Sequence, residues 1–85
     1  MRLQDQRAIV TGAGSGFGEG IARKFVAEGA RVIVADRDEA AAKRVAAALG
    51  EAAFAFAADV TRAADVKAMV EAAHQRFGGL EILVN

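Results

Sequence analysis

Glycines crowd the segment from Thr11 to Gly18, which reads TGAGSGFG. Because glycine has no Cβ atom, the chain can turn sharply here and leave its main-chain N–H groups open to an anion. The residues that follow recur at helical spacing, so the free N–H groups and positive dipole end of a helix lie at the same place. This combination predicts a site for a phosphate or diphosphate group. The spacing of Gly12, Gly16 and Gly18 is G-x-x-x-G-x-G rather than G-x-G-x-x-G. The alternative is a loop whose glycines only turn the chain.

An acidic residue, Asp36, lies at a position where it could bind a second part of the same ligand. Asp36 follows residues 31–35 (Arg-Val-Ile-Val-Ala), which are predicted to form a strand, and a carboxylate there can accept hydrogen bonds from both hydroxyls of a ribose. It would also repel a 2′-phosphate, at a cost of about 1–4 kcal/mol at a few ångström. The alternative for Asp36 is ordinary turn chemistry after a strand. Arg37 could stack on a base or pair with a phosphate, whereas a helix cap accounts for Asp38.

Apolar runs and helical spacings alternate along the chain. Strands are predicted over residues 8–11, 31–35 and 53–58, and a fourth begins at residue 82. Apolar positions three and four residues apart predict three helices between them: Phe17, Ile21, Ala22, Phe25 and Val26; Ala41, Ala42, Val45, Ala46 and Leu49; Val66, Met69, Val70, Ala73 and Phe77. Gly29, Gly50 and the Gly78-Gly79 pair would end these helices, while Asp38 and Thr61 would cap the second and third.

This alternation predicts the fold class. Strands that are apolar throughout and separated by helices indicate a parallel sheet covered on both faces. Right-handed crossovers favour the strand order 3-2-1-4. We therefore predict an α/β, Rossmann-like doubly wound fold with the element order β-α-β-α-β-α-β. Residues 1–85 would form the first half of one such domain, with no second domain in the chain.

Composition excludes several function classes. The 85 residues carry a formal net charge of zero, which gives no reason to expect a nucleic acid or an anionic membrane as partner. The sequence contains no cysteine, so disulfides and thiolate metal sites are excluded, and we expect a cytoplasmic protein. His74 is the only histidine, so no metal site is expected. The charged residues of the predicted helices are interpreted as solvated: Arg23, Lys24, Glu28, Glu39, Lys43 and Arg44.

Four segments together resemble a known family. Residues 11–18 are similar to the TGxxxGxG signature of the short-chain dehydrogenases/reductases. Residues 35–37 (Ala-Asp-Arg), 59–61 (Asp-Val-Thr) and 82–85 (Ile-Leu-Val-Asn) agree with the same family in order and spacing. The resemblance covers the whole chain. It implies a Rossmann fold that binds a nicotinamide dinucleotide and a hydride transfer between nicotinamide and an alcohol or carbonyl.

The resemblance also implies roles for individual residues. The acid Asp36 favours NAD over NADP. Asp59 would accept a hydrogen bond from the adenine amine while the backbone of Val60 lies against the ring; the alternative for Asp59 is an acidic residue near a helix N-terminus. Asn85 is similar to the first Asn of the family's NNAG segment, which steadies the sheet and the cofactor ribose. The implied cofactor-binding residues are Gly12, Ser15, Gly16, Phe17, Gly18, Asp36, Arg37, Asp59, Val60 and Asn85.

The family's catalytic groups are not found in this sequence. They are a Tyr, a Lys four residues later and a Ser, all downstream of the NNAG segment, and the chain contains no Tyr. We therefore expect no catalytic residue within residues 1–85 and no activity from them alone. Three hypotheses remain: the cofactor-binding portion of an oxidoreductase, a non-catalytic dinucleotide-binding module, or a fragment of an S-adenosylmethionine-dependent methyltransferase. The last would use Gly14, Gly16 and Gly18 as a G-x-G-x-G turn.

Self-association is also expected. The predicted fourth strand, which begins at Ile82, would be an open, apolar edge of the sheet, and such edges pair with other chains.

Overall fold

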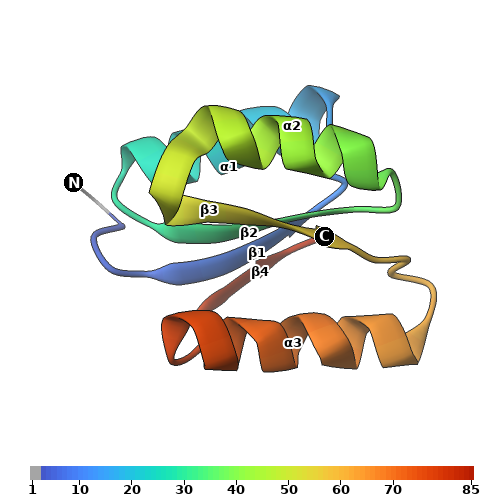
Figure 1. The fold of residues 1–85 in the computed structure, drawn as a ribbon. Coiled ribbons are helices and arrows are strands. Elements are labelled where there is room, and N and C mark those ends of the chain that lie inside the picture. Colours follow the sequence, from blue (N-terminus) through green and yellow to red (C-terminus); the bar gives the residue numbers. More distant parts are fainter. Residues whose placement is uncertain (1–2) are drawn as a thin grey trace.

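Four parallel strands form the centre of the computed structural model, which describes residues 3–85 (Figure 1). They are β1 (Arg7–Thr11), β2 (Arg31–Asp36), β3 (Ala53–Ala57) and β4 (Ile82–Val84). The strand order is β3-β2-β1-β4, which confirms the predicted order 3-2-1-4. In the register of the sheet, Ile9 of β1 lies opposite Ile33 of β2 and Leu83 of β4.

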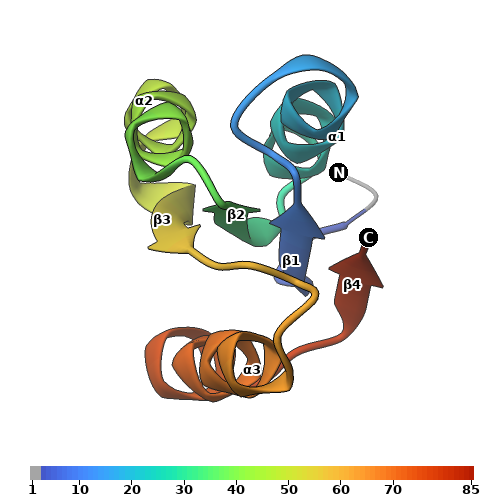
Figure 2. The ribbon, with the colours of Figure 1, turned by 90° about the vertical axis from the view of Figure 1, so that its right-hand side faces the viewer.

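Helices cover both faces of this sheet, so the predicted doubly wound α/β architecture is confirmed (Figures 1 and 2). The helices α1 (Gly16–Ala27) and α2 (Glu39–Leu49) lie on one face, and α3 (Ala63–Phe77) lies on the other. A short 3-10 helix, η1 (Gly50–Ala52), connects α2 to β3. None of the helices within residues 3–85 combines the length and the apolar character that a membrane crossing requires.

The alternation of side chains along the strands divides the core into two layers. Successive residues of a strand point to opposite faces. The layer under α1 and α2 therefore contains Val10 and Val34, and the layer under α3 contains their neighbours Ile9 and Ile33. All four side chains are fully buried. Burial on both faces explains why β1 and β2 are apolar without a polar alternation.

The helix boundaries confirm one predicted cap and correct another. Asp38 caps α2, since its Oδ1 accepts a hydrogen bond from the N–H of Ala41 at 3.1 Å. Thr61 does not cap α3: the N-cap position is Arg62, whose side chain makes no capping hydrogen bond. The Thr61 hydroxyl donates instead to Asp59 Oδ1 at 2.6 Å. The prediction missed this pairing because a hydroxyl can bond a nearby carboxylate as readily as a helix N–H.

An ion pair fixes β4 beside β1. The Nε of Arg7 and its main-chain N–H both donate to Glu81 Oε1, at 2.9 and 2.8 Å, and Arg7 Nη2 pairs with Glu81 Oε2. The same guanidinium donates through Nη1 to the carbonyl of Phe77 at 3.4 Å, at the end of α3. Hydrogen bonding to Arg7 holds the pKa of the Glu81 carboxyl below its usual value. The turn between α3 and β4 is thereby tied to the first residue of β1.

Candidate functional site

The carboxyl ends of the parallel strands bring the predicted site residues to one edge of the sheet. The glycine turn follows β1, Asp36 ends β2, Asp59 follows β3, and Asn85 follows β4. This edge faces the viewer in Figure 2. In open α/β sheets, ligands bind at the carboxyl ends of the strands, where the connections diverge to the two faces. Here α1 and α3 leave this edge on opposite sides of the sheet (Figure 2).

Some main-chain N–H groups of the glycine turn bond to the sheet, whereas others have no partner within helix α1. The N–H of Ala13 donates to the carbonyl of Ala35 at 3.0 Å, which ties the turn to β2. Helix α1 begins at Gly16, and the side chain of the N-cap residue Ser15 makes no capping hydrogen bond. The first bond within the helix runs from Glu19 N–H to the Ser15 carbonyl. The N–H groups of residues 16–18 therefore have no acceptor inside the helix and are the donors available to an anion.

The turn also has the open space that a diphosphate needs. Gly12 and Gly16 adopt φ angles of +63° and +57°, in the left-handed region that favours glycine. A Cβ atom built on either residue would meet no other atom within 4 Å. The backbone is thus bare and unobstructed beside the free end of α1. These residues fit the diphosphate group of a dinucleotide.

Gly18 plays a different part from the glycines before it. A Cβ atom at this position would lie 2.2 Å from the carbonyl oxygen of Gly12 and 3.0 Å from the Cα of Ala13. Such distances are far below van der Waals contact, and both neighbours are backbone atoms. The missing side chain therefore lets the first turn of α1 pack directly on the glycine turn. A contact between Gly18 and a cofactor stays a prediction.

The carboxylate of Asp36 is held by two main-chain donors. Its Oδ2 accepts from the N–H of Gly14 at 2.9 Å, and its Oδ1 accepts from the N–H of Asp38 at 2.9 Å. The turn chemistry weighed as an alternative is therefore present. Each carboxylate oxygen can accept a second hydrogen bond, so a ribose with two hydroxyls can still be bound. Asp36 is half-buried at the edge where the turn and β2 meet.

Gly14 belongs to the site, although the glycine spacing assigns it no role in dinucleotide binding. A Cβ atom here would lie 2.8 Å from Asp36 Oδ2 and 2.8 Å from the Cβ of Ala41. A side chain at residue 14 would therefore displace the carboxylate. The spacing of the glycines gave no signal for this contact, because it depends on how the turn packs against β2 and α2.

Arg37 and Asp59 meet in a shallow hollow of about 260 Å³, with Ala57, Ala58 and Asp65. The hydroxyl and the N–H of Thr61 hold the pKa of the Asp59 carboxyl below its usual value, and the charges of Arg37 and Arg62 act in the same direction. Thr61 occupies Oδ1 of Asp59, and the second carboxylate oxygen can accept from an amine. The hollow brings Arg37 and Asp59 together, and a contact of either residue with adenine stays a prediction. Val60 is 43% exposed and does not line this hollow.

Asn85 is joined to β1 by Thr11, which begins the signature segment 11–18 but is not among the implied cofactor-binding residues. The hydroxyl of Thr11 lies 3.1 Å from Asn85 Oδ1 and 3.2 Å from the carbonyl oxygen of Val84. One hydroxyl proton is shared between these two acceptors. Thr11 thereby bridges the carboxyl ends of β1 and β4, next to the glycine turn. This geometry places Asn85 at the edge of the site.

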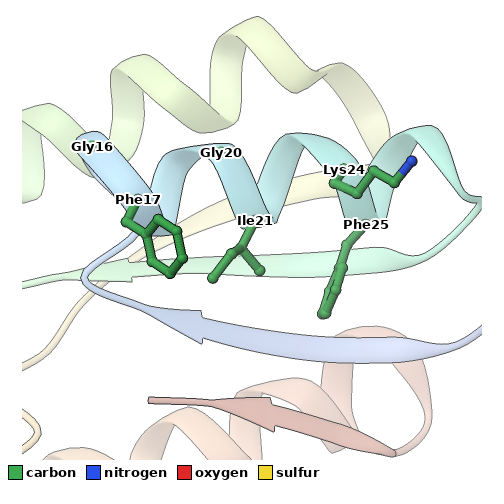
Figure 3. Close-up of a pocket in the computed structure, with 6 residues that line it drawn as sticks. All are labelled: Gly16, Phe17, Gly20, Ile21, Lys24 and Phe25. Atoms are coloured by element: carbon green, nitrogen blue, oxygen red, sulfur yellow. The ribbon is translucent and has the colours of Figure 1, made fainter.

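Phe17 lies apart from the polar part of the site. Its side chain is 88% exposed and lines an apolar groove of about 510 Å³ along α1, together with Ile21 and Phe25 (Figure 3). Among the lining residues, Gly16 and Phe17 also belong to the predicted cofactor set, whereas Asp36 does not line the groove. The first turn of α1 thus presents its N–H groups to the edge of the sheet and its aromatic side chain to this groove.

Comparisons with known proteins agree with this geometry. The model of the short chain dehydrogenase family matches residues 6–85. Galactitol 2-dehydrogenase of Agrobacterium fabrum is 52% identical over 85 residues, which are 100% of this chain and 33% of the relative. Sorbitol dehydrogenase of Cereibacter sphaeroides is 44% identical over 100% of this chain and 33% of its own length. The chain therefore spans about a third of the curated relatives that it matches.

Solved structures give the same result. The crystal structure of a 3-ketoacyl-(acyl-carrier-protein) reductase from Brucella melitensis, complexed with NADH, superimposes with a TM-score of 0.92 at 54% identity. The match covers 95% of this chain and 33% of the reductase. The methyltransferase hypothesis finds no support in these comparisons. The family match, the strand order and the glycine turn together show that the chain belongs to the short chain dehydrogenase family.

Proposed function

We propose that this chain binds NAD(H) as the cofactor-binding portion of an oxidoreductase. The reaction would be a hydride transfer between nicotinamide and an alcohol or carbonyl. One observation carries the proposal: the N–H groups of residues 16–18 have no acceptor within α1, the backbone is unobstructed at Gly12 and Gly16, and the Asp36 carboxylate lies beside the same turn. The N–H groups suit a diphosphate, and the carboxylate suits the hydroxyls of a ribose. The Brucella melitensis reductase, whose crystal structure is a complex with NADH, gives independent support.

The residues would divide the work of binding by the part of the cofactor they meet. We assign the diphosphate to the glycine turn (Gly12, Ser15, Gly16, Phe17 and Gly18) and the adenosine ribose to Asp36. Arg37, Asp59 and the backbone of Val60 would hold the adenine, and Asn85 would support the remaining ribose. When bound, the cofactor supplies or accepts the hydride. The protein's part within residues 1–85 is to bind and orient it.

Selectivity for NAD follows from the fixed charge of Asp36. The carboxylate would accept from the ribose hydroxyls of NADH and repel the 2′-phosphate of NADPH, a difference of about 1–4 kcal/mol. We expect NADH to bind at least about fivefold more tightly than NADPH. Fluorescence titration of each reduced cofactor into the protein at its natural length measures this ratio. Equal affinities, or tighter binding of NADPH through Arg37, would contradict the proposal.

Hydride transfer is proposed only for a protein that also carries the family's Tyr, Lys and Ser. Residues 1–85 would form the N-terminal dinucleotide-binding half of one Rossmann domain. The second hypothesis, a dinucleotide-binding module without catalysis, predicts the same cofactor affinity but no turnover with any alcohol or carbonyl. An assay of NADH formation by the protein at its natural length separates the two. A cytoplasmic location remains a prediction from composition.

Self-association through β4 is a further expectation for residues 1–85 alone. Within the described residues, β4 pairs with β1 on one side and ends the sheet on the other, and Leu83 is 49% exposed. An open strand edge with apolar side chains pairs readily with another chain. Sedimentation velocity of the 85-residue chain should show dimers or larger species that increase with concentration. A single monomeric species at high concentration would argue against this interface.

A further inference from the structure

Arg44 makes a contact that its place in the sequence does not predict. The sequence indicates a solvated residue of its helix, but Arg44 Nη2 donates to the carbonyl oxygen of Gly14 at 2.8 Å. The same nitrogen lies 3.6 Å from Glu19 Oε1, in the first turn of α1. A residue in the middle of α2 thus reaches both the glycine turn after β1 and the helix that begins there.

The contact with Arg44 completes the immobilisation of Gly14. The N–H of Gly14 donates to Asp36 Oδ2 at 2.9 Å, and its carbonyl accepts from Arg44. Glycine has the largest conformational freedom of all residues and no side chain by which it can be held. A hydrogen bond on each side of the Gly14 Cα therefore fixes both of its backbone torsions, and with them the direction of the N–H that meets Asp36.

Helix α2 holds the Asp36 carboxylate from both sides. Directly, the N–H of its N-cap residue Asp38 donates to Asp36 Oδ1 at 2.9 Å. Indirectly, Arg44 holds Gly14, whose N–H donates to Oδ2. The two donors bond different oxygens of the Asp36 carboxylate, so together they fix the orientation of the carboxylate plane. One donor belongs to the N-cap of α2, and the other belongs to the glycine turn, which Arg44 of α2 holds in place. Loss of Arg44 would release the second of these donors and leave the first intact.

We propose that Arg44 is a positioning residue for cofactor selectivity: it fixes Gly14, and through Gly14 it holds the Asp36 carboxylate where it accepts ribose hydroxyls and opposes a 2′-phosphate. This inference rests on the proposed preference for NAD. A simple electrostatic role for Arg44 predicts the opposite effect. As a nearby positive charge it would attract a 2′-phosphate, so its removal would weaken NADPH binding more than NADH binding.

An Arg44→Met variant tests the proposal in the protein at its natural length. We expect the ratio of NADPH to NADH dissociation constants to fall by about three- to tenfold, the value of one hydrogen bond. Lys43→Met is the matched control. It removes the same charge one residue away, from an exposed pair with Glu39 at 3.8 Å, and should leave the ratio unchanged. Arg44→Lys keeps a charged donor and should restore part of the selectivity.

The Gly14 amide resonance provides a readout independent of cofactor. In Arg44→Met it should move toward the position of an amide that is not bonded to a carboxylate, and in Lys43→Met it should stay in place. A retained ratio in Arg44→Met, an equal loss for both cofactors, or a rise in the ratio would overturn the inference. These outcomes are distinct from a failure of the proposed function, which would appear as no preference for NADH in the unaltered protein.

Discussion

A Gly18→Ala variant is expected to lose both stability and dinucleotide binding. The added Cβ would lie 2.2 Å from the carbonyl oxygen of Gly12 and 2.7 Å from its carbonyl carbon. These are backbone atoms that cannot rotate away, so the first turn of α1 must move off the glycine turn. Overpacking of this kind costs about 1–3 kcal/mol, a large share of a small domain's stability. The same movement displaces the N–H groups of residues 16–18, so NADH affinity should fall at least about tenfold. Urea unfolding and NADH titration measure the two effects.

Gly20→Ala is the matched control for this variant. Gly20 lies in the same helix, but a Cβ atom there would meet no other atom within 4 Å. The substitution should leave NADH affinity unchanged and raise stability by up to about 1 kcal/mol, because alanine favours a helix over glycine. If Gly18→Ala were tolerated as well as Gly20→Ala, the close packing of α1 on the turn would not be a requirement of the site.

An Asp36→Ala variant is expected to lose the preference for NAD. The substitution removes the acceptors proposed for the ribose hydroxyls and the charge that opposes a 2′-phosphate. NADH affinity should fall about tenfold or more, while NADPH affinity should fall less or rise. The main-chain N–H groups of Gly14 and Asp38 also lose their partner, which should cost about 1–3 kcal/mol of stability. Dissociation constants for both cofactors and a urea unfolding curve give the measurements.

Asp38→Ala separates selectivity from stability. Its side chain caps α2 through the N–H of Ala41, and its own N–H, which meets Asp36, is retained in the variant. The loss of the cap should cost about 1 kcal/mol without changing the ratio of NADPH to NADH affinity. If the ratio of NADPH to NADH affinity is the same in Asp36→Ala as in Asp38→Ala, Asp36 does not determine the preference for NAD.

The fold was predictable because it depends on local sequence patterns and on general rules of chain connection. Apolar runs that alternate with helical spacings determine a parallel sheet, and the handedness of crossovers favours one strand order. The cap at Asp38 was predictable because a carboxylate just before an apolar helical stripe has one common use. The error at Thr61 came from the same kind of reasoning. Asp59, two residues away, competed for its hydroxyl, and the helix began one residue later.

The contacts that join distant residues of the site could not be predicted from the sequence. Gly14 and Asp36 are 22 residues apart, and Gly14 and Arg44 are 30 residues apart. Their contact depends on how closely the turn packs against α2, which no spacing of glycines records. Thr11 and Asn85, 74 residues apart, meet because Arg7 and Glu81 hold β4 in register with β1. The residues proposed to bind the cofactor belong to recognisable motifs, whereas the contacts that position them do not follow from any motif.

The central claim is that the free N–H groups at the start of α1 bind the diphosphate of NADH. Chemical shifts of the backbone amides, followed while NADH is added to the protein at its natural length, test it most directly. The account predicts the largest changes at Gly16, Phe17 and Gly18, with further changes at Asp36 and Arg37. Saturable binding of NADH that leaves the amides of residues 16–18 unmoved would contradict it.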